Sequence, residues 1–260
     1  MMHLDLDEEL LETLGNRMKR LEADALKLSE SLLPAVIRLD GCHFHTWIKQ
    51  AKLSKPFDDR MCNAMQKAAL ALCESIPGCI MAYVQSDEIS LVLRPGESKD
   101  WSPWYGNKVQ KLCSVSASVC AVAFNDEIRN QLGSSLAPPA FFDSRVIFMP
   151  NEEEVFNCLV WRQNDCIRNS VSALAQSLFS ARELSGKKRE EQLKMMLEKG
   201  VDWTKLPEDK KLGALVHKES IPGEFNGKVF TRSKFFIDKM IPKFTEDKDF
   251  LKRAYGFNLQ

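Results

Sequence analysis

Short apolar runs alternate with longer stretches of helical periodicity over the first part of the chain. The runs that have the length of buried strands are 35–39, 79–84, 89–93 and 144–149. Between them, residues 57–76 and 106–124 repeat apolar or small side chains every three or four positions, which is the period of a helix. The resulting order, β-α-β-β-α-β, is the ferredoxin-like pattern, and it predicts an α+β fold with appended helices at both ends.

The appended helices are predicted from the segments that flank this unit. Residues 8–32 carry apolar side chains at helical spacing, and this helix would pack along its own domain or form an oligomer contact. Asn151 is an N-cap residue followed by three glutamates, so a helix is expected to begin there and to reach about Leu184. Shorter helical stretches follow at 187–199 and 207–213, and the tail beyond them shows no clear period.

Two aspartates stand where apolar runs end. Asp40 follows the first run, and Asp87 lies in the turn between the second and third runs, next to Glu88. In the predicted fold a right-handed crossover joins the first two strands, and the third strand inserts between them in the antiparallel direction. The end of the first strand then lies beside that turn. The pattern therefore predicts that Asp40 and Asp87 meet at one edge of the sheet.

Converging carboxylates of this kind are suited to divalent cations, as in a polymerase-type palm. Their hard oxygen ligands favour Mg²⁺, and two such ions about 4 Å apart can activate a hydroxyl and stabilise a leaving pyrophosphate. Gly41 has no side chain, so its backbone carbonyl can approach a metal or a triphosphate closely. The alternative is that Asp40 and Asp87 are ordinary strand-end and turn residues, because Asp is common in turns.

The loop after Gly41 contains further candidates for ligand contact. Two of the four histidines, His43 and His45, flank Phe44 here, but no further ligands at zinc spacing accompany them. Nucleotide contact is the preferred interpretation, with Phe44 stacking on a base and His45 reaching the phosphates or the ribose. The alternative is that these are partly exposed loop residues.

A polar stripe crosses the long helix that is expected after residue 151. Arg162, Asp165 and Asn169 fall on one face of it, and Arg168 lies on a neighbouring flank. Polar residues on an inward face need a partner, and either an incoming triphosphate or a structural salt-bridge network would supply one. Other basic residues that could bind phosphate, or that are ordinary solvated charges, are Arg38, Lys55, Lys210 and Lys211.

The composition is that of a globular protein. The 260 residues are 44% hydrophobic and 28% charged with zero formal net charge, which allows one large core and excludes the disordered and fibrous classes. No apolar stretch approaches the roughly 20 residues of a membrane helix, so no membrane partner is expected. The acidic first residues do not resemble a secretory signal. None of the eight cysteines forms a C-x-x-C pair, so reduced thiols in a cytoplasmic protein are expected.

The charges are unevenly distributed along the chain. From Arg182 to the end, eighteen Lys and Arg stand against thirteen Asp and Glu, an excess of +5, so residues 1–181 carry −5. A basic tail beside an acidic half suits a protein that binds polyanions and metal ions, although many solvated helices share this pattern.

These segments, in this order, resemble the tRNA-His guanylyltransferase family, whose members elongate RNA in the 3′-to-5′ direction. The similar stretch runs from about Gly15 to Cys166 and more weakly to about Lys211. The pieces at 86–88 and 161–166 are the most specific. The segments that carry the resemblance are Arg38–Gly41, Phe44–His45, Lys55–Pro56, Gln85–Glu88, Phe142–Val146 and Trp161–Cys166.

The resemblance implies a magnesium-dependent nucleotidyltransferase that adds nucleotides to the 5′ end of a tRNA. The 5′ end would be activated by adenylylation with ATP or as a triphosphate, and the 3′-hydroxyl of GTP or another NTP would attack it. Asp40, Asp87 and Glu88 would be catalytic, and Asp40, the Gly41 carbonyl and Asp87 would bind two Mg²⁺ ions. The residues expected to hold the nucleotide are Asp40, Gly41, Cys42, His43, Phe44, His45, Lys55, Ser86, Asp87, Arg162 and Asn169.

The resemblance also implies a domain organisation and an assembly. Residues 1–150 would form the palm catalytic domain with its N-terminal helix. Residues 151–260, a helical region and tail, would complete the nucleotide and tRNA site. A homotetramer is the implied assembly.

Two departures from the family pattern bear on the substrate. Cys42 and His43 replace Arg-Asn, and residues 167–170 replace the His-Ile-Asn-Asn of the eukaryotic enzymes, so that only Asn169 is kept. Template-dependent repair of 5′-truncated tRNAs, associated with the bacterial, archaeal and phage-type branch, is therefore the preferred function. The alternatives are the addition of a single 5′ guanylate to tRNA-His, a non-catalytic palm-fold protein that binds RNA or nucleotides, and a nucleotide cyclase on the same fold.

Overall fold

One antiparallel sheet with helices on both faces makes up the protein. The computed structural model describes residues 13–24, 33–96, 101–133, 137–225 and 228–256. The strands are β1 (Ala35–Gly41), β2 (Cys79–Gln85), β3 (Glu88–Leu93), β4 (Phe142–Phe148), β5 (Ala214–Phe225) and β6 (Lys228–Asp238). The helices are α1 (Leu14–Asp24), α2 (Phe44–Gln50), α3 (Asp59–Ser75), α4 (Val109–Leu132), α5 (Glu152–Leu178), α6 (Ala181–Leu184), α7 (Arg189–Glu198), α8 (Glu208–Lys211) and α9 (Lys248–Tyr255), with 3₁₀ turns η2 (Trp104–Asn107) and η3 (Trp203–Lys205).

The strand order, β4-β1-β3-β2-β5-β6, confirms the predicted arrangement of the first three strands. β3 lies between β1 and β2 and runs antiparallel to both, and β4 pairs with the other side of β1. The end of β1 therefore lies beside the start of β3, with Asp40 opposite Glu88 in the ladder. This register is what positions the candidate site.

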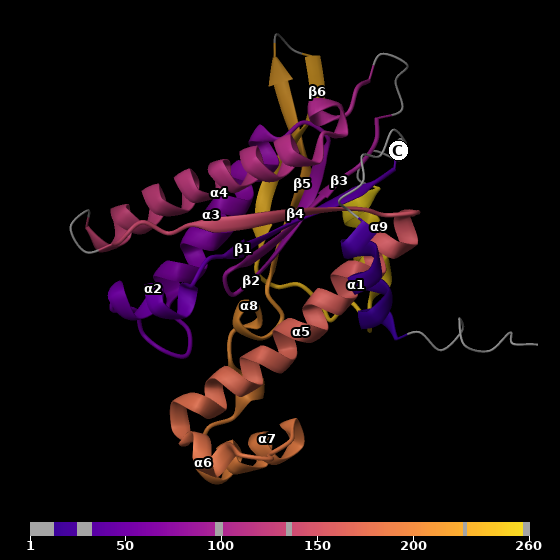
Figure 1. Cartoon of the computed structure of the whole chain (residues 1–260). Helices are drawn as coiled ribbons and strands as arrows, with labels where there is room; N and C mark the ends of the chain where they lie inside the picture. The colour runs from indigo at the N-terminus through magenta and orange to yellow at the C-terminus, as the bar shows by residue number, and fades with distance from the viewer. Residues whose placement is uncertain (1–12, 25–32, 97–100, 134–136, 226–227, 257–260) are drawn as a thin grey trace, which may run out of the picture.

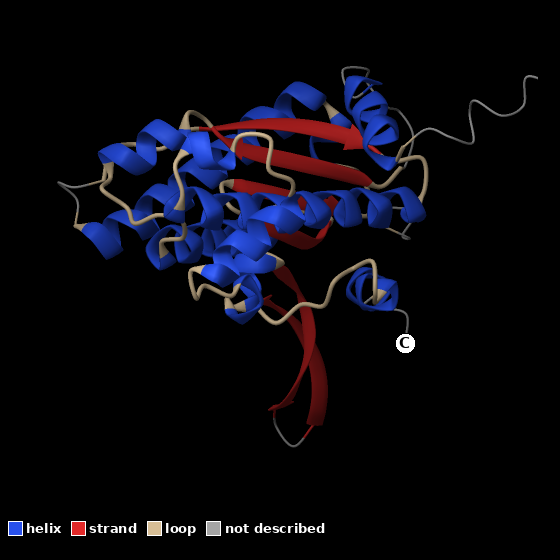
Figure 2. Cartoon of the chain, turned by 90° about the horizontal axis from the view of Figure 1, so that it is seen from below, coloured by secondary structure: helices blue, strands red, loops and turns tan. Residues whose placement is uncertain are grey.

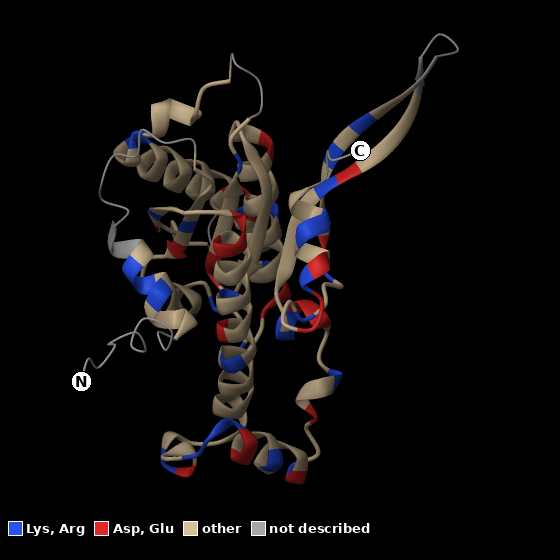
Figure 3. Ribbon diagram, turned by 90° about the vertical axis from the view of Figure 1, so that its right-hand side faces the viewer, with Lys and Arg blue, Asp and Glu red and all other residues tan. Residues whose placement is uncertain are grey.

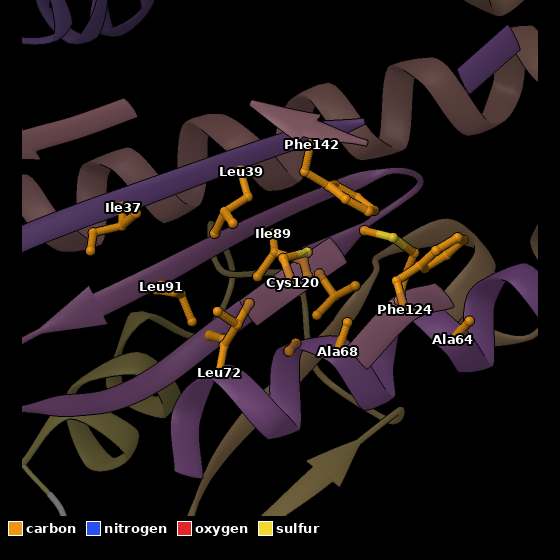
Figure 4. Close-up of a cluster of buried hydrophobic side chains, with 14 of the residues drawn as sticks. Ile37, Leu39, Ala64, Ala68, Leu72, Ile89, Leu91, Cys120, Phe124 and Phe142 are labelled. Carbon is orange, nitrogen blue, oxygen red and sulfur yellow. The ribbon is translucent and has the colours of Figure 1, made fainter. Parts of the chain in front are cut away.

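The side chains of β1 alternate between two cores, as the two-residue period of a strand requires. Ile37 and Leu39 belong to the core under α3 and α4, where they face Leu72 and Phe124 (Figure 4). Val36 points the other way, into the core that α1, α5 and α9 cover. The sheet is thus a middle layer with helices on both faces (Figure 1).

Several helix boundaries differ from the prediction because of capping. Asp58 accepts a hydrogen bond from the Arg60 N–H at 3.0 Å and caps α3 two residues later than the apolar pattern predicts. Asn151 caps α5 as predicted, accepting from the Glu154 N–H at 2.9 Å. α5 ends at Leu178 rather than near 184, since Ser180 begins a separate helix with its own capping box.

Other elements depart further from the prediction. α2 occupies part of a segment that the sequence predicts as a loop, and α4 continues to Leu132 rather than ending near 124. Only the last four residues before Leu212 are helical in the predicted stretch 207–213. Of the predicted helix at 8–32, the described part is α1, and the remainder lies outside the described residues.

The sequence pattern does not predict β5 and β6, which form a long hairpin on the free side of β2. β2 pairs with β5 only at 214–217, so the outer part of the hairpin extends beyond the sheet (Figures 1 and 2). There the ribbon covers no core, and it lacks the alternation by which a half-buried strand is recognised.

The second half of α5 also extends beyond the sheet. Val171 and Leu174 pack with Met196 of α7 in a small third core, so that α6 and α7 form a lobe at the end of α5 (Figure 1). Lys and Arg segments alternate with Asp and Glu segments along this lobe in Figure 3. The positive excess of the C-terminal part is therefore mixed with acidic residues here.

All eight cysteines are free thiols. Burial raises the pKa of Cys166 to about 11 and also raises that of Cys120, so both remain protonated and pack as small apolar side chains. No helix in the described part of the chain combines the length and the apolarity that a membrane span requires.

Candidate active site

The two aspartates that mark strand ends in the sequence lie at one edge of the sheet. Asp40 stands between Glu88 on β3 and Asp143 on β4 in the two ladders of β1. The next residue, Gly41, donates its backbone N–H to the carbonyl oxygen of Asp87 at 3.0 Å. The predicted meeting of β1 with the turn that carries Asp87 is therefore confirmed.

The carboxylates at this edge repel one another. Burial, and then the charges of Asp87, Glu88 and Asp143, raise the pKa of Asp40 to about 6. Burial also raises the pKa of Asp87, although the hydrogen bond from the Ser86 hydroxyl to its Oδ1 (2.8 Å) lowers it. A carboxylate whose ionised form is disfavoured in this way gains from a nearby cation.

The donors at this edge fit magnesium. The carboxylates of Asp40 and Asp87 are hard oxygen ligands, and Gly41 adds a carbonyl beside them. Among the described residues, no group of three or more His, Cys, Asp and Glu side chains is arranged to hold a metal alone. Magnesium is commonly held by one or two carboxylates together with the phosphates of a substrate. These residues thus fit a metal that is bound together with a nucleotide.

Glu88 does not face this edge as a free carboxylate. Arg162 of α5 donates from Nε to Glu88 Oε1 (2.7 Å) and from Nη2 to Oε2 (2.5 Å), and Gln85 donates to Oε1 at 3.1 Å. Only 11% of the Glu88 side chain and 10% of the Arg162 side chain are exposed. A buried ion pair, which connects β3 to α5, thus occupies the oxygens of Glu88, and its catalytic role stays a prediction.

Arg162 is likewise occupied, and the expectation that it holds the nucleotide stays a prediction. Its Nη2 also donates to Asp165 Oδ2 at 2.9 Å, and its guanidinium lies 4.6 Å from the centroid of the Trp161 ring. Asp165 accepts further bonds from Arg168 and from Asn169 Nδ2 (3.2 Å). Of the two interpretations of the polar stripe, the structure shows the salt-bridge network.

The loop after Gly41 is folded into α2. Phe44 is 3% exposed, its ring stacked on Trp47 with centroids 5.1 Å apart and packed against Phe124 and Phe142. The prediction that Phe44 stacks on a base is wrong, because this ring closes one end of the core under α3 and α4. A Cβ on Gly41 would lie 2.2 Å from the Phe44 ring, so only glycine fits without movement of the ring.

The other residues of this loop do not line the cavities beside α5. His43 and His45 are exposed, and His43 occupies the N-cap position of α2 with a φ of 55°. Cys42 is half-buried, and its backbone N–H donates to the Phe141 carbonyl at 2.8 Å. None of the three lines the two cavities that adjoin α5. Their expected contact with a nucleotide is not supported by this placement.

Two adjoining cavities form a groove between α5 and the segment before α3, which we call the α5 groove. Their volumes are about 250 and 150 Å³. The smaller cavity reaches Ser86, next to Asp87, as well as Asn169, and the larger one reaches Lys55 and Gln176. The residues that line both are Ile48, Pro56, Asp58, Met61 and Ala173. A groove that combines apolar walls with a few polar side chains is the usual form of a small-molecule site.

Three residues near the site have no role in the sequence prediction, namely Asp143, Arg145 and Asp209, and a fourth, Lys210, is there only one of several possible phosphate ligands. Asp143 and Arg145 on β4 flank Asp40 and Arg38 in the ladder, and their alternation in a predicted strand could have placed them there. Asp209 and Lys210 line the α5 groove from α8. Nothing in the sequence separates this lysine from its neighbour Lys211.

Comparisons with known proteins agree with this arrangement. Residues 15–150 match the family model described as tRNAHis guanylyltransferase. A bacterial tRNA(His) guanylyltransferase-like protein solved in complex with ATP is 32% identical, with a TM-score of 0.78 over 94% of this chain and 100% of that chain. Another, in complex with GTP, is 31% identical, with a TM-score of 0.69 over 92% and 97%. The probable tRNA(His) guanylyltransferase of Mus musculus is 30% identical over 65% of this chain and 56% of its own length.

The matched region includes the parts on which the site depends. It contains β1 with Asp40 and Gly41, the turn with Asp87, and the whole β-α-β-β-α-β unit. The structural similarity to the ATP complex extends over nearly the full length of the chain. The chain therefore belongs to the tRNA(His) guanylyltransferase family, and it is a nucleotidyltransferase.

Proposed function

We propose that this protein is a magnesium-dependent 3′-5′ nucleotidyltransferase that adds nucleotides to the 5′ end of tRNA and repairs truncated 5′ ends against a template. The observation that carries the proposal is the pair of carboxylates, Asp40 and Asp87, at one edge of the sheet, where Ser86, the neighbour of Asp87, lines the α5 groove. The unit from β1 to β4 would serve as a ferredoxin-like, polymerase-type palm. Residues 151–260 would supply the wall of α5 and the contacts to the tRNA.

Asp40, Asp87 and the Gly41 carbonyl would hold the magnesium ions. When bound, the ions would activate the attacking hydroxyl and stabilise the charge on the leaving pyrophosphate. The Gly41–Asp87 backbone hydrogen bond keeps the two ligand-bearing segments together. The Glu88–Arg162 pair fixes the start of β3 against α5. The chain's own residues therefore hold the ligand positions in place before a substrate binds.

The α5 groove has the chemistry of a nucleoside triphosphate site. Ile48, Pro56 and Met61 offer apolar walls to a base, whereas the end at Ser86 adjoins Asp87, where the phosphates must lie to share a metal. The two bacterial relatives were solved with ATP and with GTP, which supports nucleotide binding on this fold. In this proposal ATP activates the 5′ end, and GTP or another NTP is the nucleotide that is added.

The addition of a single guanylate to tRNA-His is the second candidate, because the family is described by that reaction. One observation favours the broader substrate. Where the eukaryotic pattern has histidine after Asp165-Cys166, this chain has Ile167, which is 8% exposed and belongs to the core under α5. A buried isoleucine cannot take part in proton transfer or contact RNA.

The test is incorporation of a labelled NTP into tRNA transcripts that lack the first nucleotide. Wild-type protein with magnesium should extend tRNA-His and other truncated tRNAs alike. Asp40→Asn and Asp87→Asn should each reduce incorporation by about 10³-fold or more, because each removes a charged metal ligand. Asp126→Asn is a matched control on α4, where the carboxylate is 67% exposed and pairs with Arg129 at 3.9 Å.

Three outcomes of this assay would each contradict a different part of the proposed function. Extension of tRNA-His alone would favour the single-guanylate enzyme. Metal-dependent NTP binding without incorporation would favour a non-catalytic binding protein. Full incorporation by Asp40→Asn or Asp87→Asn, with unchanged unfolding curves, would remove the carboxylate pair from the mechanism.

A further inference from the structure

One of the two lysines that line the α5 groove belongs to α8, and the other is Lys55 in the larger cavity. Lys210, on α8, lines the smaller cavity together with Ser86 and Asn169, and its side chain is 8% exposed. It is the one cationic side chain among the described residues that line this cavity. A buried ammonium group in a cavity that also reaches Ser86, the neighbour of Asp87, is a feature that the proposed function does not yet use.

The backbone that carries Lys210 is held firmly to the sheet. The Tyr83 hydroxyl donates to the Leu212 carbonyl at 2.7 Å, and Gln163 Nε2 lies 3.4 Å from the same oxygen. Gly213, with a φ of 79°, lies so close to β2 that a Cβ would be 2.5 Å from the Val84 carbonyl. The position of Lys210 is therefore set by the sheet and by α5, and does not depend on a free loop.

The neighbouring lysine serves a different purpose. Lys211 Nζ donates to the Thr204 carbonyl and to Glu208 Oε1, both at 2.8 Å, and this closes the turn before α8. Both lysines are candidate phosphate ligands in the sequence. The structure turns only Lys210 toward the groove.

The two carboxylates near the Lys210 ammonium group differ in their distance from it and in their exposure. Its Nζ lies 2.8 Å from Asp59 Oδ1 and 3.7 Å from Asp209 Oδ2. Asp209 is buried and accepts from Gln66 Nε2 at 3.2 Å, whereas the Asp59 side chain is 84% exposed. An ion pair with so exposed a carboxylate contributes little. Water can solvate Asp59 once it is released, so this partner is easily exchanged.

Lys210 keeps its positive charge when no ligand is bound. Burial alone would lower its pKa, but hydrogen bonds to Asp59 and Cys62 raise it above the ordinary lysine value. An ammonium group carries three protons, so a phosphate oxygen could take the place of the Asp59 carboxylate while the contacts to Cys62 and Asp209 remain.

On the basis of the proposed function, we propose that Lys210 binds the phosphate chain of the nucleoside triphosphate and that Asp59 is an exchangeable counter-ion that occupies it in the nucleotide-free protein. Two observations favour phosphate over base. Lys210 shares its cavity with Ser86, at the end next to Asp87, whereas the apolar side chains of Ile48 and Met61 line both cavities and so lie farther along the groove. A strongly hydrated ammonium is also a common phosphate ligand.

The test is calorimetric titration of full-length protein with ATP and with adenosine, in magnesium and without an RNA acceptor. Lys210→Met should weaken ATP binding about tenfold and leave adenosine binding unchanged, since only ATP carries the phosphate chain. Lys210→Arg should bind ATP within about threefold of wild type, because the charge is kept. Asp59→Asn should tighten ATP binding about fivefold, since the competing carboxylate is gone.

Matched controls lie on the exposed side of α3. Lys67→Met and Glu74→Gln change charge by the same amounts on solvent-exposed positions and should leave both affinities unchanged. Unchanged ATP binding in Lys210→Met, or an equal loss for adenosine, would overturn the role of Lys210. Unchanged ATP binding in Asp59→Asn would overturn the role of Asp59. If wild-type protein bound no ATP, the proposed function itself would fail, which distinguishes the two cases.

Discussion

The burial of the Glu88–Arg162 ion pair leads to a testable prediction about the free energy of unfolding. Arg162→Met would leave Glu88 buried without its cation, and Asp165 would lose a partner as well. Removing one member of a buried ion pair typically costs about 3–5 kcal/mol, because the remaining charge is neither solvated nor paired. The two short, charge-assisted bonds of 2.7 and 2.5 Å and the low exposure of both side chains place this pair in that class.

The measurement is urea unfolding at neutral pH, followed by tryptophan fluorescence and circular dichroism, for a double-mutant cycle. Glu88→Gln with Arg162→Met should cost less than the sum of the single variants by at least about 1 kcal/mol, since neither charge is then left alone. The matched control is Arg145→Met, whose pair with Asp143 has a comparable distance of 3.0 Å but about half-exposed side chains. It should cost about 0–1 kcal/mol. Equal costs for Arg162→Met and Arg145→Met would refute the reasoning from burial.

Two further predictions concern the segments on either side of the site. Gly41→Ala should cost about 1–3 kcal/mol in urea unfolding and abolish incorporation of labelled NTP, because its Cβ would meet the Phe44 ring at 2.2 Å and displace the carbonyl. If Gly41→Ala unfolded at the wild-type urea concentration and still incorporated NTP, the Phe44 ring and α2 would have moved to make room for the new Cβ. Asp58→Ala should cost about 0.5–2 kcal/mol at pH 7, because the carboxylate caps α3 and binds Arg60. The hydrogen bond from Arg60 lowers the pKa of Asp58 to about 2, below the roughly 3.9 of an unfolded chain. The difference from wild type should therefore be full above about pH 4 and shrink as the pH falls toward 2. A difference that grows in acid would contradict this sign.

The positions of Asp40 and Asp87 could be predicted because they follow from the order of apolar runs in the sequence and from general rules of strand topology. Apolar runs mark β1, β2 and β3, and the β-α-β-β-α-β pattern then predicts their order, with β3 between its neighbours. Once β3 lies between its neighbours, the end of β1 must adjoin the β2–β3 turn. The resemblance to the family indicates which reaction the two aspartates would serve, but their relative position follows from the strand order alone.

The residues whose surroundings were not predicted depend on contacts between distant segments. Phe44 follows a metal-ligand motif and looks like a surface aromatic, yet Phe124 and Phe142 complete a core around it. Arg162 has the right type and spacing for a phosphate ligand, and only the approach of Glu88 from β3 shows that it is occupied. The outer β5–β6 hairpin was not predicted because its pairing partners are only each other.

Because Asp40 lies in a strand that is hydrogen-bonded on both sides, unfolding can disrupt the site only in a particular way. β1 is paired on both sides, to β3 and to β4, and the N–H of Gly41 bonds to the turn of Asp87. The two carboxylates can separate only when these backbone bonds break, which in such a sheet requires the cooperative opening of the core. Amide exchange at Asp40 and Gly41 should therefore follow global unfolding, while the outer hairpin exchanges by local fraying. Fluctuations or proteolytic cuts at the periphery would leave the catalytic geometry of the molecule intact.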